Sequence, residues 1–168
     1  AGWWQGHEAW CNLCAGGTMG VVYGAGSLWQ WRLHADEPGH APFFLGPDAG
    51  WREALDYEGS RYVGLLARIL DGLPITDAEP NWEVTLGRRG LLVPGKLFIA
   101  YTSEGGPLKL FGDDIPPYYR VVDPRTGEVL DKGTLDPNWH PEGLPNTSAG
   151  MWIPDVGGGP RVYIAYEG

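Results

Sequence analysis

The sequence predicts two architectures in succession, an α/β segment over residues 1–77 and an antiparallel β-sandwich over residues 78–168. Apolar residues recur at helical spacing only before about residue 80. One nearly all-apolar stretch between the helical segments has the pattern of a buried strand. After residue 80, short apolar stretches alternate with turns that contain Gly and Pro, which is typical of an antiparallel sandwich.

The first part of the chain contains two predicted helices and one predicted strand. Near-helical spacing predicts a short helix over 5–16, which ends at paired glycines. The stretch GVVYGA at 20–25 predicts a strand covered on both faces, as in parallel sheets. An apolar stripe predicts a longer helix over 48–70, ended by Gly72 and Pro74. Helix, buried strand, long loop and helix is the order of an α/β barrel or a doubly wound fold.

The second part of the chain contains only predicted strands. Turn sequences such as Pro94-Gly95 separate them, because Pro presets φ and Gly accepts a positive φ. The predicted strands cover residues 81–87, 90–93, 96–102, 108–111, 118–123, 128–133 and 161–168.

The composition excludes several classes of partner. Gly and Pro make up a quarter of the chain, but nine Trp, eight Tyr and four Phe bring too much apolar surface for a disordered protein. The net charge is −9 without a basic stripe, so we expect neither nucleic acid nor an anionic membrane as partner. No apolar run has the length of a membrane span. No cofactor is expected, since GAG at 24–26 lacks the third glycine of a dinucleotide fingerprint.

Three stretches resemble one known family: GTMGVVYGAGSLWQW, WREALDYEGSRYVGLLARIL and YRVVDPRTGEVL. Together they resemble the C-terminal third of the apiosidase-like glycoside hydrolases, which are (β/α)8-barrel enzymes with a C-terminal β-sandwich. This resemblance implies that residues 1–77 are the C-terminal segment of a TIM-barrel glycosidase domain, with the last strand and its flanking helices. Residues 78–168 are then the C-terminal sandwich domain, and the expected ligand is a carbohydrate.

The resemblance also implies that the catalytic carboxylates lie outside this chain. The opening AGWWQGHEAW resembles the loop and helix after the seventh barrel strand, so the expected acidic residue would lie just before Ala1. The chain begins with Ala rather than Met, and we expect the missing N-terminal barrel portion of the same protein as a further partner. Whether this chain by itself is an enzyme therefore stays open.

Aromatic residues follow the predicted last barrel strand. Active sites of such barrels are built from the loops at the C-terminal ends of the strands. Tyr23, Trp29 and Trp31 are therefore predicted to form part of a sugar subsite. The alternative is that they are apolar plugs between barrel and sandwich, where Trp packing is equally useful.

Acidic residues in the same loop are weaker catalytic candidates. Glycoside hydrolysis needs two carboxyl groups roughly 5–10 Å apart. Asp36, Glu37 and Asp48 follow the predicted strand and could approach such a site, with His34 and His40 beside them. A solvated acidic loop is the simpler alternative.

One cluster has the spacing of metal ligands, although we expect no metal site. His7, Cys11 and Cys14 lie at i, i+4 and i+7 on one face of the first predicted helix. Imidazole and thiolate are good zinc ligands, but no fourth ligand is near in the sequence. Burial of the cysteines as small apolar side chains is the alternative.

Three functions are compatible with the sequence. The first is the C-terminal portion of a glycoside hydrolase acting on plant or microbial polysaccharide. The second is a non-catalytic carbohydrate- or protein-binding sandwich module, which predicts a row of exposed aromatic residues. The third is a structural brace, which predicts that the domain boundary buries most of the tryptophans. The location is unknown, and a polysaccharide substrate would suit the extracellular space or the periplasm.

Overall fold

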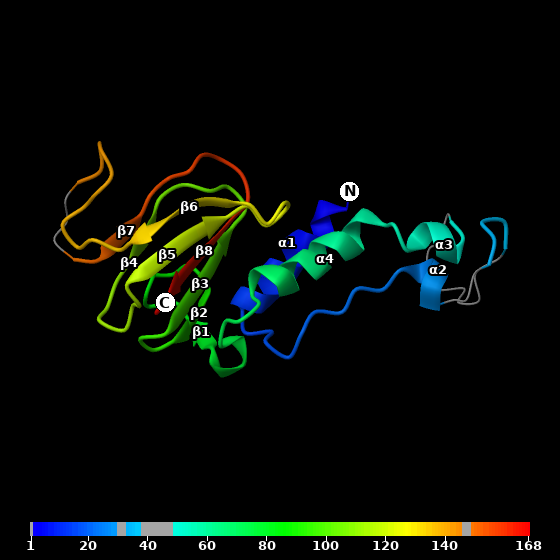
Figure 1. Cartoon of the computed structure of the whole chain (residues 1–168), viewed down its shortest axis with the longest axis horizontal. Coiled ribbons are helices and arrows are strands. Elements are labelled where there is room, and N and C mark those ends of the chain that lie inside the picture. The colour runs from blue at the N-terminus through cyan, green and yellow to red at the C-terminus, as the bar shows by residue number, and fades with distance from the viewer. Residues whose placement is uncertain (1, 30–32, 38–48, 146–148) are drawn as a thin grey trace.

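The computed structural model describes residues 2–29, 33–37, 49–145 and 149–168 of the chain. The molecule is elongated, with the strands at one end, α1 and α4 beside them, and α2 and α3 at the far end (Figure 1). The helical elements are α1 (Trp3–Cys14), α2 (Gly26–Trp29), α3 (Trp51–Ala54), α4 (Glu58–Ile69) and the 3-10 turn η1 (Ile75–Asp77). No helix among the described residues is long and apolar enough to cross a membrane.

The described strands form two antiparallel sheets. The larger sheet has the order β1-β2-β3-β8-β5-β6, and β4 pairs with β7 in the smaller one. The predicted antiparallel sandwich is therefore confirmed, although one of its layers has only two strands. The strands are β1 (Glu79–Asn81), β2 (Gly90–Val93), β3 (Leu97–Thr102), β4 (Leu108–Leu110), β5 (Tyr118–Val122), β6 (Val129–Thr134), β7 (Met151–Ile153) and β8 (Arg161–Tyr166).

The central strands β3 and β8 are buried on both faces, which explains their continuous apolar sequences. Their register pairs Ile99 with Ile164 and Phe98 with Ala165. The isoleucine pair belongs to the core beneath the helices, and the second pair belongs to the core beneath the β4–β7 sheet. Because successive side chains point to opposite faces, a strand between two layers must be apolar throughout.

A single hydrophobic core joins the helices to the larger sheet. Trp10 and Leu13 of α1 and Leu66 of α4 belong to the same buried cluster as Leu91 and Ile99 of the sheet. The first predicted helix is present, at 3–14 rather than 5–16, and it ends two residues before Gly16, which takes a φ of +106°, a conformation that suits glycine. The predicted domain boundary between residues 77 and 78 stays a prediction.

The single long helix predicted over 48–70 is wrong. The structure has two helices, α3 and α4, separated by Tyr57 in an extended conformation with a ψ of 131°. Leu55, which lies on the same apolar stripe of the predicted helix as Leu66 and Ile69, is 56% exposed, whereas the other two are buried. Helical stability in proteins comes mainly from packing of the apolar face, so the helix persists where α1 and the sheet cover that face.

The strand predicted over 20–25 is also absent from the structure. These residues follow a non-helical path with no strand pairing, and Val22 and the preceding Met19 are fully exposed. A strand needs neighbours that satisfy its backbone N–H and C=O groups, and no described strand lies beside this segment. The apolar sequence therefore has no partner sheet within the described residues.

Strand prediction after residue 80 failed at three places. Residues 82–87 form turns rather than a strand, because the Asn81 side chain accepts a hydrogen bond from the Val84 N–H at 3.0 Å. The edge strand β1 contains Pro80 and little apolar sequence, so it was not predicted. The three-residue strand β7 was missed because it is too short to show a period.

Candidate functional site

Tyr23 attaches the unpaired segment to the two long helices. Its half-buried ring lies against Gly59 of α4, where a Cβ atom would come within 2.8 Å of Tyr23 Cε2. The same Cβ atom would lie 3.0 Å from Gln5 Oε1 of α1, so Tyr23 sits where the two helices meet. This contact orients the chain that leads into α2.

The other predicted sugar-binding residues cannot be placed in full. Trp29 ends α2, at the end of the molecule far from the sandwich (Figure 1), but its side chain lies outside the described residues. Trp31, among the predicted sugar contacts, and Asp48, among the catalytic candidates, also lie outside the described residues. The sugar subsite therefore stays a prediction.

The acidic pair after α2 forms part of a local turn. The N–H of Glu37 donates to the His34 carbonyl oxygen at 3.2 Å, and its Oε2 accepts from the Leu33 N–H at 2.9 Å. Asp36 is exposed beside it. Glu37 thus stabilises its own turn, which accords with the simpler alternative of a solvated acidic loop.

His7 and Cys11, two of the weak metal-ligand candidates, lie close together on α1. His7 Nδ1 lies 2.7 Å from the Tyr101 hydroxyl, and its Nε2 lies 3.8 Å from Cys11 Sγ. Cys14 is buried, and burial raises the pKa of its thiol to about 12, which accords with the alternative of a small apolar side chain. Within the described residues, no group of three or more His, Cys, Asp or Glu side chains could hold a metal ion.

Buried Asp123 forms ion pairs with the exposed Arg125 and the buried Arg161 at the turn between β5 and β6. Asp123 Oδ2 lies 2.7 Å from Arg125 Nη2 and 3.6 Å from Arg161 Nη1. Burial favours the protonated carboxyl, but the hydrogen bonds from Arg125 and the charges of Arg125 and Arg161 outweigh it and hold the pKa of Asp123 below its usual value. Asp123 is therefore ionised, and its ion pairs with Arg125 and Arg161 stabilise the turn.

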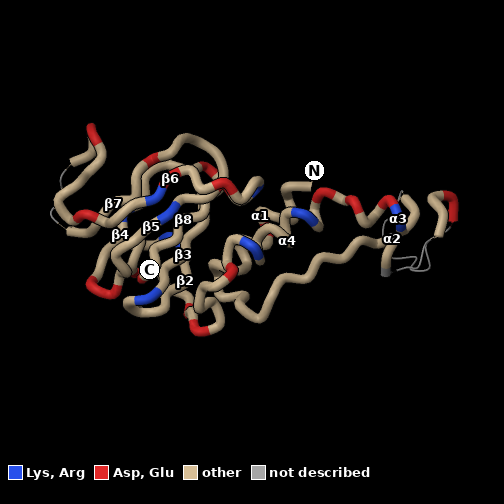
Figure 2. Tube along the Cα trace, viewed as in Figure 1, with Lys and Arg blue, Asp and Glu red and all other residues tan. Residues whose placement is uncertain are grey.

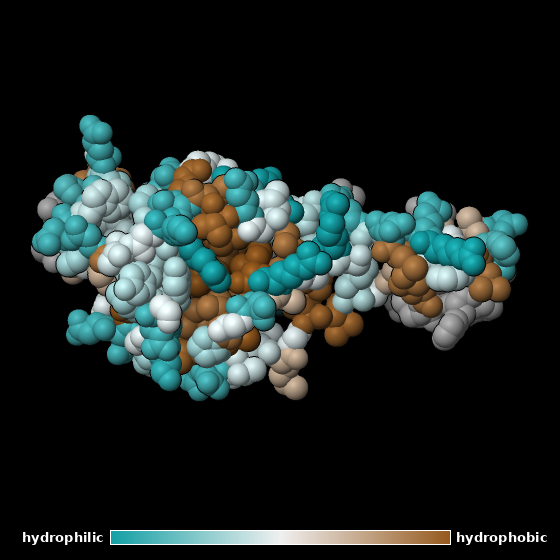
Figure 3. Space-filling model, in the orientation of Figure 1, coloured by the Kyte–Doolittle hydropathy of each residue, from teal (hydrophilic) through white to brown (hydrophobic). Residues whose placement is uncertain are grey.

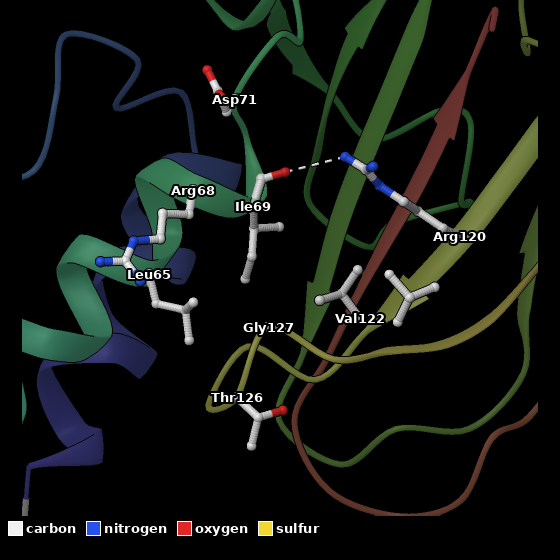
Figure 4. Close-up of a pocket in the computed structure, with 9 residues that line it drawn as sticks. Leu65, Arg68, Ile69, Asp71, Arg120, Val122, Thr126 and Gly127 are labelled. Atoms are coloured by element: carbon white, nitrogen blue, oxygen red, sulfur yellow. Dashed lines mark hydrogen bonds between the residues drawn. The ribbon is translucent and has the colours of Figure 1, made fainter.

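A groove of about 410 Å³ lies between α4 and the β5–β6 hairpin. Figure 3 shows apolar surface in this hollow, and Figure 4 shows that the guanidinium groups of Arg68 and Arg120 do not converge. Arg120 donates to the Ile69 carbonyl oxygen at 3.1 Å, so its positive charge lies at the C-terminal end of α4. Because Arg120 is engaged in this way, we interpret the groove as a structural seam.

A second groove, which we call the aromatic groove, lies on the sandwich and has a volume of about 290 Å³. Its lining combines aromatic rings with short polar side chains. This groove is not predicted from the sequence, because β5, β7 and the loop before β7 are separate segments of the chain. The available signal was a tryptophan within the polar, Pro-rich loop DPNWHPEG. The lining residues are Tyr119, Thr134, Asp136, Trp139, Trp152 and Pro154.

The fold, a helix-covered antiparallel sheet with a small second sheet, is shared with solved glycoside hydrolases. One structure described as "Glycoside hydrolase" matches 99% of this chain and 37% of its own length, with 16% identity and a TM-score of 0.64. A glycoside hydrolase family 5 protein from Bacteroides vulgatus matches 97% of this chain and 35% of its own length, with 16% identity and a TM-score of 0.65. This chain thus spans little more than a third of the length of these structures.

Comparison with protein-family models identifies a more specific group of glycoside hydrolases. Residues 5–77 match the family model described as "Apiosidase-like, catalytic domain". Over residues 5–77, this match confirms the relationship to apiosidase-like glycoside hydrolases that the sequence motifs indicated. Comparison with curated proteins finds no match.

Proposed function

We propose that this chain is the C-terminal portion of a glycoside hydrolase that acts on plant or microbial polysaccharide. The observation that supports this proposal most directly is the unpaired apolar segment at 20–25. It lies within the 5–77 match to an apiosidase-like catalytic domain, and Val22 within it and Met19 just before it are exposed. In the complete protein this segment would be the last strand of a (β/α)8 barrel.

The arrangement of neighbouring elements suits this role. Helix α1 precedes the segment and helix α4 follows it, and Tyr23 holds the segment against both. A strand flanked by two helices that pack on each other is the unit from which an α/β barrel is built. The remaining strands would come from a barrel portion that precedes this chain in the complete protein, as the greater length of the relatives suggests.

In this proposal, the loop after the segment supplies an aromatic wall of the sugar site. Trp29 and Trp31 follow the C-terminal end of the proposed strand, where barrel active sites are built. Their rings would lie against the apolar C–H face of a sugar, and Tyr23 would position the loop. The two catalytic carboxylates would come from the preceding barrel portion, because Glu37 is engaged in its own turn.

Hydrogen exchange tests the proposed strand. In the 168-residue chain alone, we expect the amides of residues 20–25 to exchange without protection, since no described strand pairs with them. In the protein encoded by the complete gene, strand pairing should slow their exchange by orders of magnitude. Equal exchange in both proteins would overturn the proposal.

Activity on an aryl glycoside gives the second readout. We expect no turnover by the 168-residue chain, since it would lack the groups that protonate the leaving oxygen and attack the anomeric carbon. The complete protein should hydrolyse the glycoside. Robust turnover by the 168-residue chain would contradict the proposal and direct attention to Asp36 and Glu37.

A further inference from the structure

We propose that the aromatic groove of the sandwich binds a neutral carbohydrate chain, as a second sugar site distinct from the barrel site. The choice of a carbohydrate ligand rests on the proposed function. The site itself rests on the geometry of the groove. β7 and its neighbouring loop lie at the opposite end of the molecule from α2 (Figure 1), so the two sites would contact different parts of one long polysaccharide.

Trp152 is held in place before any ligand binds. It lies in β7 opposite Lys109 of β4, and Lys109 Nζ is 5.3 Å from the centre of the Trp152 ring. The same Nζ lies 5.1 Å from the centre of the Phe111 ring, so the ammonium group contacts both rings. A fixed indole loses little side-chain entropy when a sugar packs on it.

The loop that presents Trp139 is ordered by local hydrogen bonds. Asp136 Oδ1 accepts from the Asn138 N–H at 2.8 Å, and the Trp139 N–H donates to the Asp136 carbonyl oxygen at 3.2 Å. Trp139 is 40% exposed, so its ring is available at the groove. This turn therefore places a second indole on the groove and a carboxylate beside it.

Tyr119 is anchored where it lines the groove. Its hydroxyl donates to Asp131 Oδ2 at 2.9 Å, and burial together with this bond raises the pKa of Tyr119 to about 12. The hydrogen bond to Asp131 holds the ring in one orientation. Three aromatic rings and two short polar side chains, Thr134 and Asp136, therefore line one small groove.

This lining fits a neutral sugar better than other ligands. Indole rings cover the apolar faces of sugar rings, while the Asp136 carboxylate and the Thr134 hydroxyl can accept hydrogen bonds from sugar hydroxyls. A volume of about 290 Å³ is at the small end for ligand sites, which suits a ring or two of an extended chain. Asp136 and the net charge of −9 disfavour an anionic polysaccharide, and Figure 2 shows acidic residues at both the strand end and the α2–α3 end of the molecule.

The exposure of the tryptophans agrees with a binding role rather than a purely structural one. Among the tryptophans whose side chains the structure describes, only Trp10 is fully buried. A brace would instead bury most of them at the boundary between helices and sheet. Trp82, which is 52% exposed and does not line the groove, provides a matched control.

Affinity gel electrophoresis of the 168-residue chain tests the proposal. The probes are arabinoxylan, xyloglucan and mixed-linkage β-glucan as neutral chains, polygalacturonate as an anionic chain, and gelatin as a protein. We expect retardation by at least one neutral polysaccharide only. Replacing Trp139→Ala should weaken that binding roughly five- to thirty-fold, as expected for the loss of about 1–2 kcal/mol. Trp139→Phe should restore much of it, and Trp82→Ala should leave it unchanged.

Different results would contradict the proposed ligand and the proposed site. Absence of retardation by all three neutral polysaccharides, or binding to gelatin alone, would overturn the proposed ligand. Equal weakening by Trp82→Ala and Trp139→Ala would show that the groove is not the site. Circular dichroism of each variant separates loss of binding from loss of fold. Because no hydrolysis is measured, failure here is distinguishable from failure of the proposed barrel function.

Discussion

At the scale of single residues, Asp123 shows how a buried charge stabilises a turn. It lies in the turn sequence DPRTG, and its two arginine partners are far apart from each other in the chain. Arg125 is two residues away, whereas Arg161 opens β8. Arg161 also donates to the carbonyl oxygens of Gly158 and Pro160, so the cluster joins two loops.

Asp123→Asn should lower the free energy of unfolding at pH 7 by about 3 kcal/mol, because the buried Arg161 loses its counter-ion. The folded pKa of Asp123 is lower than its unfolded value, so the folded state binds fewer protons. The stabilisation is therefore present above about pH 4 and is lost as the pH falls through the folded pKa. Urea denaturation from pH 7 to pH 3 should show the variant and the wild type converging.

The exposed Asp113 provides the control for this pH dependence. Asp113→Asn should change stability by less than about 0.5 kcal/mol at every pH. A constant difference between Asp123→Asn and the wild type from pH 7 to pH 3 would mean that packing, and not ionisation, explains the loss.

Trp29→Ala tests the proposed sugar wall in the complete protein. Losing an indole that covers some tens of Å² of sugar surface should cost about 1–2 kcal/mol and weaken sugar binding about five- to thirty-fold. Isothermal titration with the substrate gives the affinity, and thermal melting gives the stability. Normal sugar binding with a much lower melting temperature would identify Trp29 as a core plug.

At the scale of secondary structure, α4 contains two glycines with opposite surroundings. Gly59 lies against Tyr23, whereas a Cβ atom at Gly64 would meet no heavy atom within 4 Å. Glycine destabilises a helix relative to alanine. A glycine in a helix is therefore explained where a neighbouring side chain leaves no room for a Cβ atom, and otherwise it only lowers stability. The contact with Tyr23 explains Gly59 alone.

Gly64→Ala should raise the free energy of unfolding by about 0.5–1 kcal/mol, because alanine has the higher helix propensity. Gly59→Ala should give no gain and a loss of about 1 kcal/mol, because its Cβ atom would overlap Tyr23. Urea denaturation of the two variants side by side provides the measurement. An equal gain from both would show that Tyr23 moves away at no cost.

At the scale of the whole molecule, the helices and the sandwich share one core. The cluster that contains Trp10 and Leu66 extends through Leu91 and Ile99 into the sheet. The 77/78 boundary predicted from sequence therefore runs through contacts between α1, α4 and the larger sheet. Such a shared core favours cooperative unfolding of the helices with the sheet.

Urea unfolding should accordingly show one midpoint by far-UV circular dichroism and by tryptophan fluorescence. Leu66→Ala should lower that midpoint for both probes and cost about 2–4 kcal/mol, because the side chain is 8% exposed and lies in the shared core. Leu33→Ala, at a 60% exposed side chain, should leave it unchanged. Two separate transitions would mean that the two parts fold independently.

The sequence by itself determined the elements whose pattern is local. The first helix, most strands of the sandwich and the turns between them follow from residue spacing and from Gly and Pro, and the motifs identified the family relationship.

Tertiary structure decided which of the other predicted elements form and which residues meet at the groove. The apolar stretch at 20–25 has a strand pattern, but a strand exists only where neighbouring strands satisfy its backbone. The helix over 48–70 breaks because only part of its apolar stripe is covered. The aromatic groove joins Tyr119 of β5, Trp152 of β7 and Trp139 of the loop between β6 and β7, and the packing of the two sheets and this loop brings them together.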